Sequence, residues 1–581
     1  MILTIGIWFY VSIITFICGF EMLQLVKRVT GYAYESIGIV WMFGLVFCGV
    51  YAEYFSLFDK VGLKANLILC VISVFFLVLN RHALVEMIRV RWKVLQSVNI
   101  KKKVLMTVTF GVLLILFVLL AVQRAHHPDT DLYHAQAIRW IEEYGVVKGL
   151  GNLHNRLAYN SAFMCLQALF SFSSFFNQST HVLNGYIAFG ICVDIVGFLL
   201  FRKEKKATKV SFFMAAAILL YICNESTLYT LSSPNTDFMA LVLAAYILFH
   251  WCRLLERKEK SATPYGVLCI LGAFAISLKL SVVMIMVLLL KPAIVLIKEK
   301  KVKEILLFVS LGVLILIPYF VRNVIISGYL VYPYSALDLF NVDWKMARSV
   351  VDYDKIEIAQ YGRNMYNVTK ENTPFFKWFP IWWNGQKIWL KVLFVLNIIL
   401  ILSGSIMEFI CVRKNKKWDG DRVLFWMTTV AMLLFWIITA PLERYGMLFL
   451  LLIPSQIAGY LSEKLSFKWK RILYITVNLF LVGYTLENSI ENIVLNRNEI
   501  SLKRPAYYIY RECEEVEWED MPMYIAEENC YCGYYFLPAT PYENILNYIE
   551  MRGKSIKDGY RPRKEMADIM FNNSGLIYEE N

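Results

Sequence analysis

The densest group of residues able to do chemistry lies in one short stretch, 126–134, which reads HHPDTDLYH and directly follows an apolar run. Asp129 and Asp131 are two residues apart, and His134 follows them in a segment whose pattern predicts a short amphipathic helix. Carboxylates beside a membrane are costly unless they are solvated or functional. The functional interpretation is a general base or a metal-binding pair, and the alternative is a solvated loop.

The same stretch could also bind a metal ion, because four of the seven histidines of the chain fall between residues 126 and 154. His126, His127, Asp129 and Asp131 offer the nitrogen and oxygen ligands that divalent metals accept. Their spacing matches no standard site. We therefore assign no metal ligand and leave a divalent metal open at these four residues.

Two further polar residues interrupt apolar sequence. Asp237 ends the run SSPNTD, where it is either a polar ligand in a cleft or, with Thr236, part of a helix cap. Lys279 lies in ISLKLSVVMI with apolar residues on both sides. It is a candidate for holding an anionic group, and the alternative is a lysine that reaches toward the membrane interface.

The region 322–388 and the later run PLERYG add cations, acids and aromatic rings. Arg322 and Arg444 are suited to a phosphate, although Arg444 could instead pair with Glu443 and lipid phosphates. Aromatic rings are common at membrane interfaces, and together with acids they also suit sugars. The candidate substrate-binding residues are His134, Arg139, Arg156, Asp237, Lys279, Arg322, Tyr332, Asp343 and Arg444.

The composition is that of a polytopic membrane protein. Of 581 residues, 58% are hydrophobic and only 18% are charged, against about 25% charged in a soluble chain. This excludes a soluble enzyme with one anchor and a disordered scaffold. The net charge of +13 does not indicate a nucleic-acid partner, because the basic residues cluster between apolar spans, as cytoplasmic loops do.

A spanning helix needs about 20 apolar residues, and the sequence predicts an all-α fold with about 14 of them. The first span has no basic region before it and no cleavage site, so we expect it to be retained. The run 159–178 is expected not to span, because the loops on either side then alternate correctly. The predicted spans are 2–24, 36–58, 64–80, 104–123, 181–201, 208–222, 236–253, 264–278, 280–297, 304–321, 389–411, 423–440, 444–461 and 471–488.

Basic segments predict which side each loop occupies. Segment 81–103 has seven Lys and Arg against one acid, so we expect it to be cytoplasmic. The outer loops are then 124–158 and 322–388, and both termini lie outside a bacterial plasma membrane. The other segments predicted to be cytoplasmic are 202–206, 256–260, 298–303, 413–417 and 464–471.

The chain divides into three predicted regions. Residues 1–103 contain the N-terminal spans and the basic segment, and residues 104–488 form the transmembrane core with the two outer loops. Residues 489–581 form an outer tail, a small module of mixed structure with 10 Lys and Arg against 17 Asp and Glu. Its net charge of −7 leaves +20 on the rest of the chain, which fits a tail outside and basic loops inside.

All of the polar constellations fall on the predicted outer side, and two of their motifs resemble those of known enzymes. The stretch 126–143, HHPDTDLYHAQAIRWIEE, resembles the acidic first-loop motif of the GT-C glycosyltransferase superfamily, which includes protein O-mannosyltransferases and the aminoarabinose transferases of lipid A. The run AISLKLS resembles their lysine-containing segment. SSPNTD, RNVIISGYLVYP, LDLFNVDW and APLERYG resemble stretches of bacterial membrane proteins encoded among surface-polysaccharide genes.

This resemblance implies an inverting glycosyltransferase. Its donor would be a sugar on polyprenyl phosphate, and its acceptor a surface glycan, lipid or protein. Asp129 would be the general base, with Asp131 as its helper or replacement. Lys279, Arg322 and Arg444 are the cations available to the phosphate leaving group.

Two other functions stay open. A polymerase of lipid-linked repeat units would depend on Arg156, Arg322 and Arg444 more than on Asp129. A transporter or flippase of polysaccharide or lipid carrier would form no bond. An outward cavity joining Asp129, Asp237, Lys279 and Arg322 would favour the enzymes, and a cavity through the middle of the membrane would favour the transporter.

Overall fold

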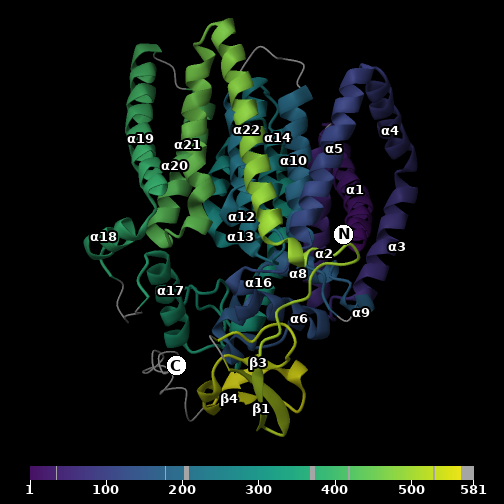
Figure 1. Ribbon diagram of the computed structural model, residues 1–581, viewed down its shortest axis with the longest axis vertical. Coiled ribbons are helices and arrows are strands. Elements are labelled where there is room, and N and C mark those ends of the chain that lie inside the picture. The colour runs from purple at the N-terminus through teal and green to yellow at the C-terminus, as the bar shows by residue number, and fades with distance from the viewer. Residues whose placement is uncertain are drawn as a thin grey trace.

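In the computed structural model, most of the chain is helical and the long helices stand side by side (Figure 1). A small group of strands from the C-terminal region lies at one end of this bundle (Figure 1). The structure describes all residues except 34–35, 177, 202–208, 367–372, 416–418, 528–529 and 564–581.

The N-terminal helices form one side of the bundle (Figure 1). Gly19 and Gly44 let the first two helices approach closely, since a Cβ at either glycine would overlap the backbone of the other helix. The next two are bent by 77° at Asn80, whose backbone leaves the helical region. These helices are α1 (Ile2–Thr30), α2 (Ile37–Ser56), α3 (Leu63–Leu79), α4 (Arg81–Gln96) and α5 (Ile100–Ala121).

The first predicted outer loop folds into short helices. The predicted short helix is confirmed as a π-helical turn that continues into an α-helix, and most residues of this α-helix are buried. The run 159–178 contains helices of eight and four residues, which are too short to span. The elements are η1 (Thr130–His134), α6 (Ala135–Tyr144), α7 (Leu150–Leu153), η2 (Asn155–Ala158), α8 (Ala162–Leu169) and α9 (Ser173–Phe176).

The central helices surround α13, which is buried over most of its length. A helix that is apolar on all sides gains most from such a position. Lys279 stands at a break between two helices, with an extended backbone. The elements are α10 (Leu183–Phe201), α11 (Val210–Ile222), α12 (Glu225–Leu228), α13 (Thr236–Glu256), α14 (Thr263–Leu278), η3 (Leu280–Leu289), α15 (Leu290–Lys298) and α16 (Val302–Ser327).

The second predicted outer loop contains two helices, and four long helices and one short helical turn follow it. Trp382 of the second loop packs between Phe394 and Trp436, which ties the loop to the bundle. The elements are α17 (Arg348–Gly362), α18 (Phe375–Gly385), α19 (Ile388–Asn415), α20 (Gly420–Thr439), α21 (Glu443–Glu463), α22 (Phe467–Leu495) and η4 (Arg497–Glu499).

The tail forms a small module of strands and short helical turns, as predicted. Strands β1 and β2 pair antiparallel, from Cys513 opposite Ala526 to Trp518 opposite Met521, and β3 joins β2 in parallel. Strands β4 and β5 form a separate antiparallel pair. The elements are β1 (Cys513–Trp518), β2 (Met521–Ala526), β3 (Ala539–Thr540), η5 (Glu543–Asn547), β4 (Ile549–Met551), η6 (Ile556–Asp558) and β5 (Tyr560–Pro562).

This module packs on the short helices of the first loop. The backbone N–H of Tyr560 donates to the carbonyl of Lys148 at 3.0 Å, and Thr540 Oγ1 donates to the carbonyl of Leu153 at 2.8 Å. Gly149 has φ 64° and lies against the carbonyl of Tyr560, where a Cβ would collide. The module is therefore part of the same folded body as the loop that carries the acidic motif.

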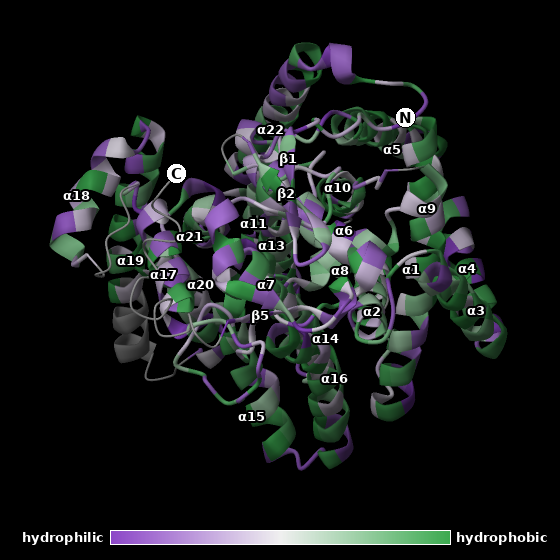
Figure 2. Ribbon diagram, turned by 90° about the horizontal axis from the view of Figure 1, so that it is seen from below, coloured by the Kyte–Doolittle hydropathy of each residue, from purple (hydrophilic) through white to green (hydrophobic). Residues whose placement is uncertain are grey.

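Within the described residues, ten helices are long and apolar enough to cross a membrane, or eleven if α3 and α4 form one bent span. The other predicted spans are also helical, but α11 and α14 have 13 and 16 residues and α22 is less apolar. Figure 2 shows hydrophobic residues along α3, α15 and α16. The chain therefore has the helices of a multi-pass membrane protein, and the total of about 14 spans stays a prediction.

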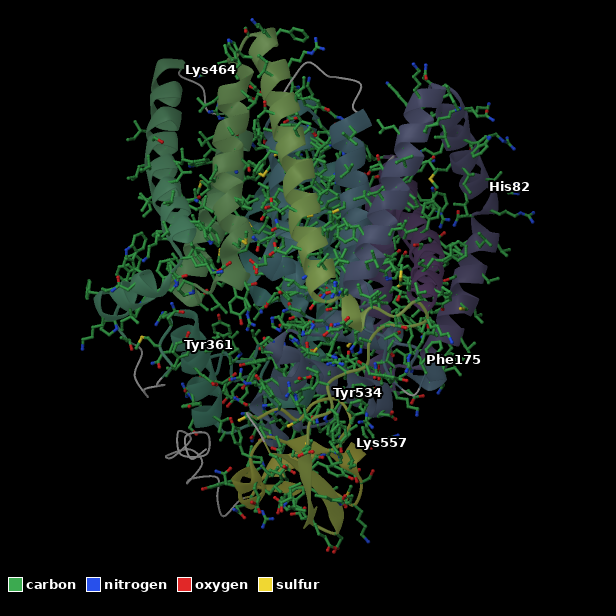
Figure 3. The ribbon with its side chains drawn as sticks, viewed as in Figure 1. His82, Phe175, Tyr361, Lys464, Tyr534 and Lys557 are labelled. Atoms are coloured by element: carbon green, nitrogen blue, oxygen red, sulfur yellow. The ribbon has the colours of Figure 1, made fainter. Side chains whose placement is uncertain are left out.

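The two ends of the bundle differ. Lys464, in one predicted cytoplasmic segment, lies at the end opposite to Lys557 of the β-module (Figure 3). The N-terminal amine donates to the carbonyl of Ser501 at 2.9 Å, so the N-terminus and the start of the tail share one end. We call these the basic end and the loop end. The predicted basic segment 202–206 lies outside the described residues.

Candidate functional site

Four separate elements bring charged side chains together at the loop end. The loop before η1 carries His127 and Asp129, the first turn of α13 carries Asp237, Lys279 follows α14, and Arg444 opens α21. We call these five residues the charged cluster. Four of the candidate residues from the sequence, Asp129, Asp237, Lys279 and Arg444, thus lie close together in the structure.

Local sequence explains how Asp237 is placed. Asn235 caps α13, because its Oδ1 accepts hydrogen bonds from the N–H groups of Asp237 and Phe238. The alternative in which Thr236 or Asp237 is the cap is therefore wrong. Asn184 of α10 donates to the carbonyls of Ser233 and Asn235 at 2.7 and 2.9 Å. The SSPNTD turn is therefore held on both sides, and the Asp237 carboxylate projects from the first turn of a buried helix.

Arg444 and Lys279 share the carboxylates of the cluster. Arg444 Nη2 lies 2.9 Å from Asp129 Oδ2, and its Nη1 lies 3.0 Å from His127 Nε2. Its Nε is 3.9 Å from Asp237 Oδ2, while Lys279 donates to Asp237 Oδ1. The Lys279 ammonium also lies 4.1 Å from the centre of the Tyr445 ring. Arg444 thus lies between the two acids, and Lys279 contacts one of them. Both cations could exchange a carboxylate partner for a phosphate.

Burial and neighbouring charges set the protonation of the cluster. Burial raises the pKa of Asp129, but Arg444 and His127 outweigh burial, so its pKa falls below the usual range. Burial lowers the pKa of His127 to about 4, with Asp129 opposing and Arg444 adding to the change. At neutral pH, Asp129 is therefore ionised and His127 is a neutral imidazole.

His134 stands beside the charged cluster without a partner. Its ring is 6.1 Å from that of His127 and 4.3 Å from that of Tyr133, and the residue is only 1% exposed. Burial lowers its pKa to about 3. Neither ring nitrogen has a hydrogen-bond partner among the described residues. An unpaired buried imidazole is costly, and a substrate hydroxyl would satisfy it.

Asp131 has a different environment from Asp129. Its Oδ2 accepts hydrogen bonds from Nε and Nη2 of Arg511 at 2.9 and 2.7 Å, and its carbonyl accepts one from Gly533. Burial raises the pKa of Asp131 against the effect of Arg511. Asp131 therefore fixes the tail to the acidic motif, and the two neighbouring acids have separate partners, Arg444 for Asp129 and Arg511 for Asp131.

We predict that Arg511→Ala loosens the tail. The Asp131 carboxylate is buried and Arg511 is partly exposed, so removing Arg511 leaves a buried charge unpaired and costs roughly 1–3 kcal/mol. Limited proteolysis of the intact protein should then cleave the tail markedly faster than in wild type. Arg504→Ala, which removes a tail cation stacked on Tyr507, is the matched control. Equal cleavage rates for the two variants would contradict the role of Arg511.

A second polar group adjoins the acidic motif. Arg156 Nη2 lies 3.0 Å from Glu357 of α17, and the Tyr159 hydroxyl donates to Asp354 Oδ1 at 2.7 Å. The Tyr159 ring packs on those of Tyr133 and Tyr332, at 5.5 and 5.8 Å. Burial and Glu357 raise the pKa of Asp354 to about 7, against the effect of Arg156. This group links the two predicted outer loops.

The raised pKa of Asp354 predicts a stability that depends on pH. A carboxyl whose pKa is higher in the folded state stabilises fully below its unfolded pKa, near 4, and less as the pH rises through about 7. The loss is of the order of 4 kcal/mol. The Tm of the wild type should therefore fall between pH 5 and pH 8, and Asp354→Asn should flatten this slope. Asp352→Asn is the control, and an unchanged slope in Asp354→Asn would refute the assignment.

The remaining candidate residues lie apart from the charged cluster. Arg322 is 2% exposed and donates to Ser56 and Asn160. Arg139 donates to the carbonyl of Tyr534 at 2.7 Å, and Asp343 accepts hydrogen bonds from Arg552. Figure 3 places Tyr534 between the bundle and the strands. Arg322 thus ties helices together, while Arg139 and Asp343 hold the β-module.

The four residues left open for a metal do not share one centre. His126 Nε2 lies 2.9 Å from Glu499, while Asp131 binds Arg511 and Asp129 binds Arg444. In the described part of the chain, no three His, Cys, Asp or Glu side chains gather as a metal site. The donor set that is present therefore does not fit a divalent ion at these four residues.

Sequence reasoning missed Tyr445, Asp354 and Arg511. Tyr445 is adjacent to Arg444, and Asp354 lies in a helical segment rich in acids, so both had a local signal. Arg511 is 380 residues from Asp131 and stands in a polar tail with no motif. Only the folded chain connects these two residues.

Comparison with known proteins identifies a family and no activity. No curated protein matches the chain, and no solved structure matches it. A family model described as a domain of unknown function, DUF8201, matches residues 1–451. This segment includes the whole charged cluster and most of the helical bundle. Because the match covers more than three quarters of the 581 residues, the protein belongs to the DUF8201 family.

Proposed function

We propose that this protein is a membrane glycosyltransferase that moves a sugar from polyprenyl phosphate to an acceptor hydroxyl of a surface glycan, lipid or protein. The reaction would take place at the loop end, on the outer face of a bacterial plasma membrane. One observation carries the proposal. A carboxylate that can accept a proton, Asp129, is paired with Arg444, and Arg444 also lies 3.9 Å from Asp237, the acid to which Lys279 donates, so that two cations able to hold a phosphate belong to the same cluster as Asp129.

The proposed reaction is a single displacement. The acceptor hydroxyl oxygen attacks the anomeric carbon while Asp129 takes the hydroxyl proton. The bond between the anomeric carbon and the phosphate oxygen breaks, and its electron pair leaves with the polyprenyl phosphate. Attack from the opposite face inverts the anomeric carbon. A phosphate leaving group needs cations more than a proton, and Arg444 and Lys279 supply them.

The ion pair of Asp129 suggests how the donor would prepare the base. In the protein alone, Arg444 keeps the pKa of Asp129 low, so Asp129 is a weak base. A donor phosphate would compete for Arg444 and Lys279, and the pKa of Asp129 would rise as its cation is drawn away. His134, neutral and unpaired, would bind a sugar or acceptor hydroxyl in the same place.

A transporter is the second candidate, because a transporter needs a cavity among the membrane helices. A cavity of about 1270 Å³ lies among the helices, and it touches no residue of the charged cluster. Its lining includes exposed apolar side chains on the outside of the bundle, such as Phe9 and Phe110. That lining suits a lipid more than a path for a polar glycan.

The polymerase would depend on Arg322 and Arg156. In the structure these two side chains bind other residues, because Arg322 donates to Asn160 and Arg156 pairs with Glu357.

Reconstitution distinguishes these functions. Purified protein in liposomes would be supplied with a pool of polyprenyl-linked sugars and acceptors, and the assay would measure released polyprenyl phosphate and new glycosidic bonds. Both products are expected in equal amounts. Movement of the lipid-linked sugar between leaflets without a new bond would contradict the proposal and favour the transporter. Joining of preformed repeat units would favour the polymerase.

A further inference from the structure

The cavity of about 1270 Å³ lies between α1, α2, α5, α10 and α13. Along α10 its lining extends from Tyr186 to Phe198. At 1.5 Å per residue this distance is about 18 Å, whereas the hydrocarbon core of a bilayer is about 30 Å thick. One leaflet contributes about half of that thickness, so the cavity is about as long as the hydrocarbon layer of one leaflet.

The mouth of the cavity is apolar and exposed. Phe9 and Ile13 of α1, Ile37 of α2 and Phe110 of α5 line it, and their exposed fractions range from 44% to 68%. In a membrane these side chains face hydrocarbon. Ser12, Trp41 and Tyr186 also line the cavity, but they hydrogen-bond to one another. The walls thus suit an alkyl chain.

The charged lining is confined to the basic end. Lys209, Arg253 and Arg257 line this part together with Glu256 and Asp194. Glu256 accepts hydrogen bonds from the N–H and hydroxyl of Ser211 at 2.8 and 2.7 Å. Asp194 accepts one from Tyr246 at 2.6 Å. Arg253 stacks on the rings of Phe198 and Phe249, at 5.1 and 5.4 Å. Three cations thus line this end of the cavity beside two acids, and the net positive charge of the lining favours an anion.

We propose that this cavity binds an anionic glycerophospholipid from the leaflet at the basic end of the bundle. One acyl chain lies in the cavity, and the phosphate lies beside Lys209, Arg253 and Arg257. This site is separate from the proposed reaction, because a sugar donor has to place its phosphate at the charged cluster on the loop end. The proposal therefore holds whether or not the protein is a glycosyltransferase.

Gly197 allows a direct test. It lines the cavity, and a Cβ built there has no atom within 4 Å, so the side chain of Gly197→Leu starts in open space and fills volume that the lipid needs. Gly483 of α22 also has open space around its Cβ and lies outside the cavity lining. Gly483→Leu is thus the matched control for the change in helix propensity.

Native mass spectrometry of the full chain, titrated with phosphatidylglycerol or phosphatidylcholine, gives the readout. Wild type and Gly483→Leu should retain phosphatidylglycerol, and Gly197→Leu should bind it about tenfold more weakly, because about two methylene groups lose their buried position. Arg257→Gln should reduce the preference for phosphatidylglycerol over phosphatidylcholine.

Three outcomes would overturn the proposal. Equal phosphatidylglycerol binding by Gly197→Leu and Gly483→Leu would exclude the cavity as the site. Equal binding of the two lipids by the wild type would exclude recognition of an anionic headgroup. Polyprenyl phosphate that stays bound and that phosphatidylglycerol does not displace would identify a different occupant.

Discussion

Asp129→Asn is expected to lower the rate of sugar transfer by roughly two to four powers of ten, with donor binding retained. Asparagine has the same shape as aspartate and can still accept a hydrogen bond from Arg444. It cannot take a proton from the acceptor hydroxyl. The measurement is turnover of the reconstituted variant beside its affinity for the polyprenyl-linked donor, so that the loss of chemistry is separated from the loss of binding.

The control for Asp129→Asn has to remove an acid from an ion pair on the same face. Asp343→Asn does this, because Asp343 pairs with Arg552 and Arg561 of the tail, away from the charged cluster. We expect Asp343→Asn to transfer sugar within a few-fold of the wild type. A nearly neutral Asp129→Asn would eliminate Asp129 as the base. If both variants lose the same amount of transfer activity, the loss comes from weaker docking of the tail and not from a missing base.

The pH profile of the wild type provides a second check on Asp129. Its pKa lies below the usual range, and that of His127 is about 4. The charges of these two groups in the free protein are therefore constant from about pH 5 upward, and activity should decline only in more acidic solution. An acidic limb near pH 6 to 7 in kcat/KM would require another base, and Asp354, with a pKa of about 7, would be the first to test.

Arg444→Ala and Lys279→Ala are the second pair of variants with large expected effects. Each removes a cation that would stabilise the phosphate leaving group, and loss of one such group costs roughly 10²- to 10³-fold in kcat. In contrast to Asp129→Asn, both variants should also raise the KM for the donor. Arg444→Lys keeps the charge but loses the planar fork, so it should recover only part of the rate.

A cation of the same face outside the charged cluster is the control for these variants. Lys345 pairs with Asp338 in the second outer loop, and Lys345→Ala should leave transfer and donor KM almost unchanged. If Arg444→Ala binds the donor as well as wild type does, the charged cluster is not the phosphate site. If Lys279→Ala only lowers Tm, Lys279 is a structural partner of Asp237.

Part of the candidate site was predictable because its signals are local. The polar stretch around Asp129 follows an apolar run, Asp237 follows a proline turn, and Lys279 interrupts two apolar runs. Each of these patterns places a polar side chain at the end of a helix. The short helix after Asp129 and the break of the run 159–178 were confirmed for the same reason, since periodicity and run length are properties of neighbouring residues.

The sequence by itself determined that the chain is a set of long apolar helices with polar motifs at their ends, because hydropathy over about 20 residues decides where a helix can meet lipid. Only the tertiary structure decided which motifs meet. It joined Asp129 to Arg444, 315 residues away, and Asp131 to Arg511, while it placed Arg322 beside Asn160. Such pairs depend on the packing order of the helices, which comes from the fit of side chains between them and leaves no local pattern.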